Sequence, residues 1–487
     1  MVRGQLRALA ATTLVLALAL VGIARAAPAR RIPVAASFYA SEPGAPVPQD
    51  FLGLSFEAGS LAQIASYSGS GDMVTLLRSL GVGVLRFGGV TADEQTAWID
   101  AATPRPAWAL GVLEASNLDA LGSLAAQSGW HVLLTLGLGH FEPQAAAREA
   151  AAAKAALGES LEAIELGNEP DSYAKHGLRP LPWTPEIYDE QVDVYRSAIE
   201  ALAPGIPLAG PDTSGSSAYE KWGLSEAIYE RPALLTGHHY PLSCAEQPPP
   251  TITRLLSQPI RQLEEVSLRR YLFIARETEV PFRLDETNTV SCGGVPGISN
   301  TFASALWAVN YLARAMSMGV AGINLQGNPA NCEGYTPVCA PSAEALATGA
   351  LRAQPEWYAL LLAKALIGER PLRTSVRPAD RPNVEVNTFL AADGTLQFVA
   401  VDDDPPGARG VALHLHVGPG FHGASILALT APSPTALSGV RLGGREVDPN
   451  GAWSQPARLP RAPNRHGLIT VKLEPSSAAL VTVSPIG

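Results

Sequence analysis

The chain has 487 residues, of which 47% are hydrophobic and 16% are charged, and its formal net charge is -10. This composition excludes an intrinsically disordered protein, and the length is enough for two or three domains. The acidic balance argues against a nucleic-acid-binding protein and against a long polyanion as the ligand, because both favour an extended basic face.

The N-terminus has the pattern of a secretory signal. Arg3 and Arg7 precede an uncharged apolar run, residues 8–23, and the small residues of Ala24-Arg25-Ala26 form a cleavage site. A transmembrane anchor is the alternative, but it needs about 20 apolar residues. We therefore predict a signal peptide over residues 1–26 and a secreted or periplasmic protein whose mature form has no membrane partner.

From about residue 49, short apolar runs alternate with stretches rich in Ala and Leu. This alternation indicates a parallel sheet with helical crossovers, and about eight units in about 300 residues are typical of a (β/α)8 TIM barrel. An open doubly wound sheet is the alternative. Strands are predicted at 51–56, 84–87, 132–138, 163–166, 207–209, 234–240, 282–284 and 322–325, and helices at 73–80, 145–156, 185–202, 260–277, 301–318 and 342–366.

From about residue 371 the helical pattern stops. The runs 384–390 and 396–401 flank Asp393-Gly394 and predict a β-hairpin, and residues 411–417 and 479–483 have the pattern of further strands. We therefore predict an α/β protein in which a TIM barrel carries an appended C-terminal antiparallel β-sandwich domain. The predicted domains are an N-terminal segment, 27–48, whose strand could pair with the β-domain, a catalytic barrel, 49–368, and the β-sandwich, 369–487.

The chain contains four cysteines, and an exported protein meets an oxidising compartment in which disulfides form. Cys332 and Cys339 are close enough in sequence to close a small loop. Cys244 and Cys292 each follow a predicted barrel strand and could join neighbouring loops. Three pairings are open, four free thiols are the alternative, and the spacing matches no zinc motif.

Two glutamates each follow a short apolar strand. Glu169 comes after the run 163–166, and Glu286 comes after the run 282–284. All strand ends of a parallel barrel converge on one face, where the active site lies. Two facing carboxyl groups hydrolyse glycosides when one protonates the leaving group and the other stays ionised. We interpret Glu169 as the acid/base and Glu286 as the nucleophile of a retaining glycosidase.

Three side chains near these glutamates have predicted supporting roles. Asn168 can hold the sugar 2-hydroxyl, Tyr240 can hydrogen-bond to Glu286 and orient it, and Arg283 can help to keep the local carboxylates ionised.

Each motif also has a purely structural alternative. Asn168-Glu169-Pro170 could be a helix N-cap followed by Pro, and a lone Glu at a strand end could be a solvated surface group. His238 and His239 could be metal ligands, but no carboxylate or third His stands at ligand spacing. Polar packing is preferred for them, and we predict no metal and no cofactor.

These stretches resemble glycoside hydrolase clan A, and within it family 79, the β-glucuronidase and heparanase family. The resemblance covers nearly all of the chain after the predicted signal peptide. It rests on Glu165-Leu166-Gly167-Asn168-Glu169-Pro170-Asp171, Asp285-Glu286-Thr287-Asn288, Gly53-Leu54-Ser55-Phe56-Glu57, Leu85-Arg86-Phe87-Gly88-Gly89 with Asp93, His238-His239-Tyr240-Pro241, and Ser291-Cys292-Gly293-Gly294 with Ser299-Asn300-Thr301-Phe302-Ala303.

The resemblance implies the same catalytic pair, with Glu169 as acid/base and Glu286 as nucleophile, and it implies retention of configuration. It further implies that Glu57, Asp93 and Asn168 hold sugar hydroxyls.

The loop after the nucleophile would receive the C6 carboxylate of a uronic acid. In the family a Tyr and glycine N–H groups do this. Here Ser291-Cys292 stands where the Tyr is expected, while Gly293 and Gly294 remain as backbone donors. Tyr335, in the loop after the last barrel strand, could supply the hydroxyl instead. Val90, where the family often has a polar residue, is a second departure.

The sequence therefore predicts a secreted exo-β-glucuronidase with a carbohydrate substrate. One alternative is an endo-acting, heparanase-like enzyme on uronic-acid polymers, which would need a basic open cleft, and no strong Lys/Arg cluster surrounds the strand ends. A clan A β-glycosidase for a neutral sugar is a second alternative, and a non-catalytic carbohydrate-binding protein is a third.

Overall fold

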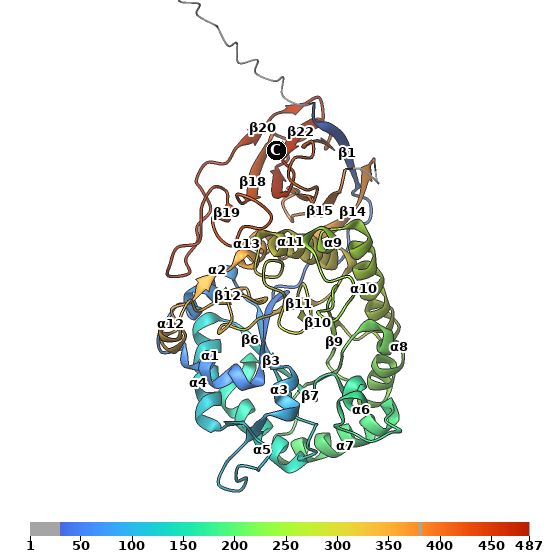
Figure 1. Ribbon diagram of the computed structural model, residues 1–487. Helices are drawn as coiled ribbons and strands as arrows, with labels where there is room; N and C mark the ends of the chain where they lie inside the picture. The colour runs from blue at the N-terminus through green and yellow to red at the C-terminus, as the bar shows by residue number, and fades with distance from the viewer. Residues whose placement is uncertain (1–29, 379–381, 487) are drawn as a thin grey trace, which may run out of the picture.

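The computed structural model describes residues 30–378 and 382–486. The predicted signal peptide, residues 1–26, lies outside these ranges. Within them, no helix combines the length and the apolar character needed to cross a membrane. Figure 1 shows a barrel surrounded by helices and a separate β-domain, with α11 (Phe302–Met318) and α13 (Pro355–Ala363) between the two.

Eight parallel strands close into a barrel in the order β10-β11-β2-β3-β6-β7-β8-β9. This confirms the predicted TIM barrel and excludes the doubly wound sheet. All eight predicted strands are present, with ends that differ by a few residues. They are β2 (Leu52–Glu57), β3 (Val84–Gly88), β6 (His131–Leu136), β7 (Leu161–Leu166), β8 (Leu208–Thr213), β9 (Leu234–His239), β10 (Phe282–Thr287) and β11 (Gly322–Gln326).

The predicted helix over residues 342–366 is wrong. Gly349 adopts a left-handed φ of 74° and ends one helix, and Pro355 begins the next, so the two helices are separate. The remaining helices are α1 (Leu61–Ser66), α2 (Met73–Leu80), α3 (Val90–Glu94), α4 (Ala115–Ser128), α5 (Pro143–Leu157), α6 (Tyr173–His176), α7 (Pro185–Leu202), α8 (Ser216–Ser225), α9 (Ile252–Leu255), α10 (Gln258–Thr278) and α12 (Ala343–Thr348).

The β-domain is one large sheet that curls around its own apolar core. Its strands pair antiparallel, including the predicted hairpin of β15 and β16, except that β1 pairs parallel with β17. This matches the predicted appended β-sandwich. The strands are β1 (Ile32–Tyr39), β14 (Arg370–Arg377), β15 (Val384–Leu390), β16 (Leu396–Asp402), β17 (Val411–His416), β18 (Ala424–Thr430), β19 (Arg441–Leu442), β20 (Arg461–Ala462), β21 (Asn464–Arg465), β22 (Leu468–Leu473) and β23 (Ser477–Val483).

The interior of the barrel changes from apolar to charged along the strands. Val84 and Ala163 belong to a small apolar cluster inside the barrel. Because residues two apart on a strand share a face, Arg86 and Glu165 come next on the same inner face. Both are fully buried. The charged layer therefore lies directly toward the carboxyl ends of the strands.

Candidate active site

A cavity of about 860 Å³ lies at the carboxyl ends of the barrel strands. It is lined by seven of the nine residues predicted to form the site. These are Glu57, Asn168, Glu169, Tyr240, Glu286, Gly293 and Tyr335.

The turn after β7 presents Glu169. Gly167 has a φ of 84°, and a Cβ there would lie 2.3 Å from the Tyr173 hydroxyl. Glu169 itself has a φ of 51°, a left-handed conformation that is unfavourable for a side chain with a Cβ and is often found at functional sites. Its backbone N–H donates to the Asp212 carbonyl at 2.9 Å, which holds the turn against β8.

Glu286 lies at an irregularity in β10. The pairing of β9 with β10 shifts register between Leu284 and Glu286. Adjacent residues of a regular strand point to opposite faces. Here Asp285 and Glu286 both reach Arg86, at 3.2 and 2.6 Å. The local bulge therefore directs two consecutive carboxyl groups to one guanidinium.

Arg86 is the central cation of the site. Its Nη1 donates to Glu286 Oε2 at 2.6 Å, and its Nη2 donates to Asp212 Oδ2 at 2.6 Å and to Asn168 Oδ1 at 2.9 Å. Arg283, which was predicted to help keep the local carboxylates ionised, makes no direct contact with Glu286, and its ion-pair partner is Asp50 at 3.6 Å. Arg283 donates instead to Asn324 Oδ1 at 2.9 Å and to a backbone carbonyl.

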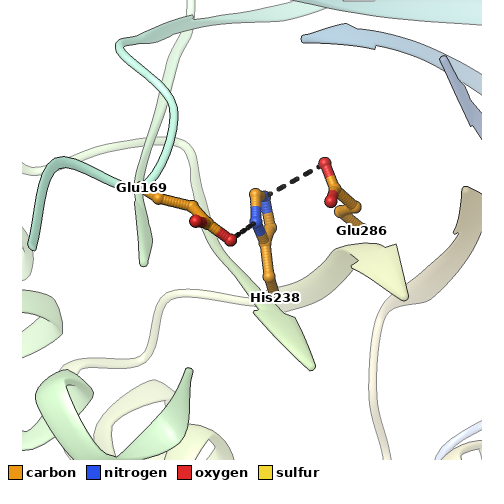
Figure 2. A group of neighbouring side chains, drawn as sticks. All are labelled: Glu169, His238 and Glu286. Carbon is orange, nitrogen blue, oxygen red and sulfur yellow. Dashed lines mark hydrogen bonds and ion pairs between the residues drawn. The ribbon is translucent and has the colours of Figure 1, made fainter. Parts of the chain in front are cut away.

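His238 lies between the two glutamates (Figure 2). Its Nδ1 is 3.0 Å from Glu169 Oε1, and its Nε2 is 3.9 Å from Glu286 Oε2 and 2.6 Å from Asp212 Oδ1. Burial lowers the pKa of His238, but Asp212 and Glu286 raise it well above its ordinary value. The carboxylates around His238 therefore favour the protonated imidazole, whose Nδ1 faces Glu169 and whose Nε2 faces Asp212 and, farther away, Glu286.

Two sets of side chains have the composition of a metal site. Glu169, His238 and Glu286 form one set, and Asp212, His238 and Asp285 form the other, each with ligand atoms within 4.8 Å of one another. Both sets share His238, whose two ring nitrogens already contact Glu169 and Asp212. Arg86 lies among the same carboxyl groups, so the two cations and their acidic neighbours form one ion-pair network.

The electrostatic environment keeps Glu286 ionised. Burial raises the pKa of Glu286, but His238, Arg86 and a hydrogen bond from Tyr240 together lower it below its ordinary value. The Tyr240 hydroxyl donates to Glu286 Oε1 at 2.8 Å, as its position after β9 had suggested. The second oxygen of Glu286 is held by Arg86, so both oxygens are oriented.

Glu57 and Asn168 both face the cavity. Glu57 accepts from Thr91 N at 3.0 Å and from Thr91 Oγ1 at 2.7 Å, and burial, followed by the nearby Glu286, raises its pKa. Asn168 uses its Oδ1 to accept from Arg86. Its Nδ2 makes no hydrogen bond within the described residues, so it is available as a donor.

Asp93 does not line the cavity, which corrects its predicted role in holding a sugar hydroxyl. It is buried and accepts from Leu138 N, Gly139 N and Asn168 N at 2.8 to 2.9 Å and from the Tyr173 hydroxyl at 2.7 Å. Its oxygens are fully used, and it fixes the loops after β6 and β7 instead.

Of the two glycines predicted to bind substrate in the loop after β10, only one lines the cavity. Gly293 lines it, and its N–H faces the Tyr335 hydroxyl oxygen. Gly294 is a packing position, because its N–H donates to the Ser291 carbonyl at 3.4 Å and a Cβ there would lie 2.5 Å from Tyr335 N. Gly294 therefore does not line the cavity, contrary to its predicted role in substrate binding. The Tyr335 hydroxyl lies 3.3 Å from that of Tyr240.

Both disulfides join the cysteines that the sequence had suggested. Cys332 pairs with Cys339, and Cys244 pairs with Cys292. The second bridge lies at the cavity and ties the loop after β9 to the loop after β10.

Sequence reasoning assigned no role to Arg86, Glu165 or Asp212, and it treated His238 only as polar packing. Their sequence context could have revealed them, because each is a charged side chain in an otherwise apolar barrel strand. A buried charge needs a partner, so such a residue predicts an ion pair inside the barrel. Which charges would meet could not be deduced, because they come from different strands.

Comparison with known proteins gives two kinds of similarity. A β-glucuronidase of Aspergillus niger is 30% identical over 210 residues, which are 38% of this chain and 38% of that protein. Heparanase of Mus musculus is 25% identical over 233 residues, 46% of this chain and 40% of that protein. The matched regions therefore span about two fifths of these curated relatives. No family model matches the chain.

Among solved structures, a 4-O-α-L-rhamnosyl-β-D-glucuronidase from Fusarium oxysporum has a TM-score of 0.71 and 19% identity, over 92% of this chain and 100% of that one. A family 51 arabinofuranosidase from Xanthomonas axonopodis has a TM-score of 0.66 and 16% identity, over 93% of this chain and 100% of that one. These likenesses show the fold. Over 38% to 46% of its length, the chain is similar in sequence to two β-glucuronidases and a heparanase. The resemblance found in the motifs is thus confirmed, and the matched segments belong to glycoside hydrolases.

Proposed function

We propose that the protein is a secreted retaining β-glycosidase that hydrolyses terminal β-D-glucuronides. The observation that carries this proposal is the proximity of Glu169 and Glu286, whose carboxylate oxygens lie within 4.8 Å of each other. Carboxyl groups about 5–5.5 Å apart are typical of retaining glycosidases, and inverting enzymes need roughly 6.5–9.5 Å to admit a water between them.

In the proposed reaction, Glu286 attacks the anomeric carbon while Glu169 gives its proton to the glycosidic oxygen. The bond to the leaving group breaks, and a glycosyl ester forms on Glu286. Glu169 then takes a proton from water, which attacks the same carbon and releases the sugar with its original configuration. Arg86 and Tyr240 orient the nucleophile, and the contact with His238 orients Glu169. In this scheme Glu57 and Asn168 bind sugar hydroxyls.

Specificity for a uronic acid rests on the loops after β10 and β11. The Gly293 N–H and the Tyr335 hydroxyl are neutral donors on the nucleophile's side of the cavity. Neutral donors suit a carboxylate that must bind beside other carboxylates, and a backbone N–H needs no counter-charge. Two of the curated relatives are named β-glucuronidases, which agrees with this assignment.

Action at chain ends is favoured over cleavage within an acidic polymer. Among the described residues that line the cavity, Lys175 is the only Lys or Arg. A sulfated or uronic-acid chain lying across the site would favour several such groups. The two disulfides fit an oxidising, extracytoplasmic location for the protein.

The first test is hydrolysis of 4-nitrophenyl β-D-glucuronide beside the matching glucoside, xyloside and galactoside. We expect a clear preference for the glucuronide, and proton NMR of the first-formed sugar should show the β-anomer. Preference for a neutral sugar would overturn the role of Gly293 and Tyr335. An α-anomer as first product would overturn the double displacement.

Glu286→Ala should lower kcat on the glucuronide by roughly 10⁴-fold or more, because it removes the covalent step. Added azide should restore part of the activity and yield a glycosyl azide. Glu220→Ala, at an exposed position of α8, is the control and should change neither quantity. Full activity of Glu286→Ala would rule out this residue as nucleophile.

A further inference from the structure

The ion-pair network beneath the cavity contains more carboxyl groups than cations. Arg86 contacts four buried carboxyl groups, and His238 is the second cation of the cluster. Asp212 and Glu286 make the short contacts with Arg86, at 2.6 Å each. These two carboxylates already balance the two positive charges. Two further buried charges without partners would each cost several kcal/mol.

The remaining pair is Glu165 and Asp285. Each lies 3.2 Å from the same atom, Arg86 Nε, whose single N–H cannot satisfy both. Glu165 Oε1 and Asp285 Oδ2 have no hydrogen-bond partner among the described residues, although both are inaccessible to solvent. Through this shared contact the two carboxyl groups are neighbours, and the negative charge of Asp285 adds to the effect of burial in raising the pKa of Glu165. A proton held between them would satisfy the unpaired oxygens and remove the surplus charge.

We propose that Glu165 and Asp285 share one proton and act as a positioning pair for Glu286. With the shared proton present, Arg86 and His238 remain committed to Asp212, Glu286 and Glu169. When it is lost, the added negative charge draws both cations toward the pair, because Asp285 Oδ2 is already 3.8 Å from His238 Nε2. The catalytic part of this inference rests on the proposed glycosidase function.

The environment of the pair supports a retained proton. Burial raises the pKa of Glu165 to about 7 and that of Asp285 to about 6, and the shift is increased by Asp285 for Glu165 and by Asp212 for Asp285. Because the groups are coupled, the protons leave in two steps that belong to the pair. The charged or titratable groups around the pair are Arg86 on β3, Asp212 on β8, His238 on β9, Arg283 and Glu286 on β10, Tyr188 on α7 and Tyr219 on α8.

The shared proton can be tested without a substrate. Infrared difference spectra of the protein between about pH 5 and about pH 9 should show loss of a protonated carboxyl band as the pair ionises. Glu165→Gln and Asp285→Asn should each remove the part of this band change that comes from the pair, since an amide replaces one of the two carboxyl groups. Glu149→Gln is the control: burial outside the cluster raises the pKa of Glu149, on α5, to about 8, so this variant should lose a separate band change near pH 8 and keep that of the pair. If Glu165→Gln and Asp285→Asn both retain the full band change, no proton is shared.

The positioning role is tested by the pH profile of kcat/KM. In Glu165→Gln the alkaline limb should move up by roughly one pH unit, because the amide keeps donating to Asp285 after the natural pair would have ionised. Glu149→Gln should leave the limb in place. If the infrared band changes but the alkaline limb of kcat/KM stays in place, the positioning role is overturned. Glu165 and Asp285 would then share a proton without affecting catalysis. Absence of glucuronide hydrolysis by the unmodified protein would contradict the proposed function and leave the infrared result untouched.

Discussion

Arg86 and His238 are the positively charged side chains at the centre of the site, and both lie beside Asp212 and Glu286. Burial alone would raise the pKa of Glu286 and leave it less often ionised, and the two cations with Tyr240 reverse this effect. Glu169 is more exposed than Glu286 and touches only His238 within the cluster. The two glutamates therefore have different surroundings, which is what an enzyme needs when one carboxyl gives up a proton and the other attacks.

Tyr240→Phe should move the acid limb of kcat/KM to higher pH by roughly 0.5 to 1 unit. Glu286 has a lowered pKa, so it stays ionised until the pH falls through that value. The Tyr240 hydroxyl stabilises the charged form, and its removal raises the pKa of Glu286. Activity would then be lost earlier on acidification. A limb that stays in place, or moves to lower pH, would contradict the assignment of Glu286 as the ionised nucleophile.

Glu169→Ala should slow glycosides with poor leaving groups by roughly 10²–10⁴-fold, while activated aryl glycosides lose far less, since general acid catalysis matters most for a basic leaving oxygen. The measurement compares kcat/KM for methyl and 2,4-dinitrophenyl β-glucuronides. Equal losses on both substrates would mean that Glu169 is not the acid.

Irregular strand ends and short loops place the site's side chains. The bulge in β10 turns Asp285 and Glu286 toward Arg86. A second register shift in β8, between Gly210 and Thr213, accompanies the positive φ of Asp212, 56°. Bulges redirect side chains at strand ends without moving the rest of the sheet. The catalytic geometry therefore depends on departures from regular strand structure.

Removal of the Cys244–Cys292 bridge, as Cys244→Ser with Cys292→Ser, should raise KM for the glucuronide by roughly fivefold with little change in kcat. The bridge fixes the loop that carries Gly293, whereas Glu169 and Glu286 are held by the barrel strands and Arg86. Steady-state kinetics on the double variant measures the two constants. A fall in kcat at constant KM would show that the loop supports chemistry and not substrate binding.

The β-domain is joined to the barrel by apolar packing and by buried ion pairs. Phe389 and Leu480 of the β-domain belong to the same core cluster as the barrel helices. Arg314 on α11 contacts Glu264 on α10 at 2.8 Å and also pairs with Glu385 on β15. These contacts favour a bracing role for the domain over glycan binding.

Arg314→Leu should lower the free energy of unfolding by roughly 3 kcal/mol, because it leaves Glu264 buried without its cation. The Tm from calorimetry should fall by several degrees, with KM unchanged at 25 °C. Arg441→Leu is the matched control. Its pair with Glu446 is more than half exposed on the Arg side, so its loss should cost less than about 1 kcal/mol. Equal effects of the two variants would exclude bracing through Arg314.

The sequence by itself determined the eight barrel strands, the β-domain and the two glutamates that approach each other, while it left three disulfide pairings open. Each depends on local information, such as apolar periodicity, turn residues or position after a strand. Only the tertiary structure decided that Arg86, and not Arg283, meets Glu286, and that Asp93 and Gly294 face away from the cavity. It also brought Glu165 to Asp285. These contacts join residues on different strands, whose inward direction depends on barrel closure and on bulges that no local pattern reports.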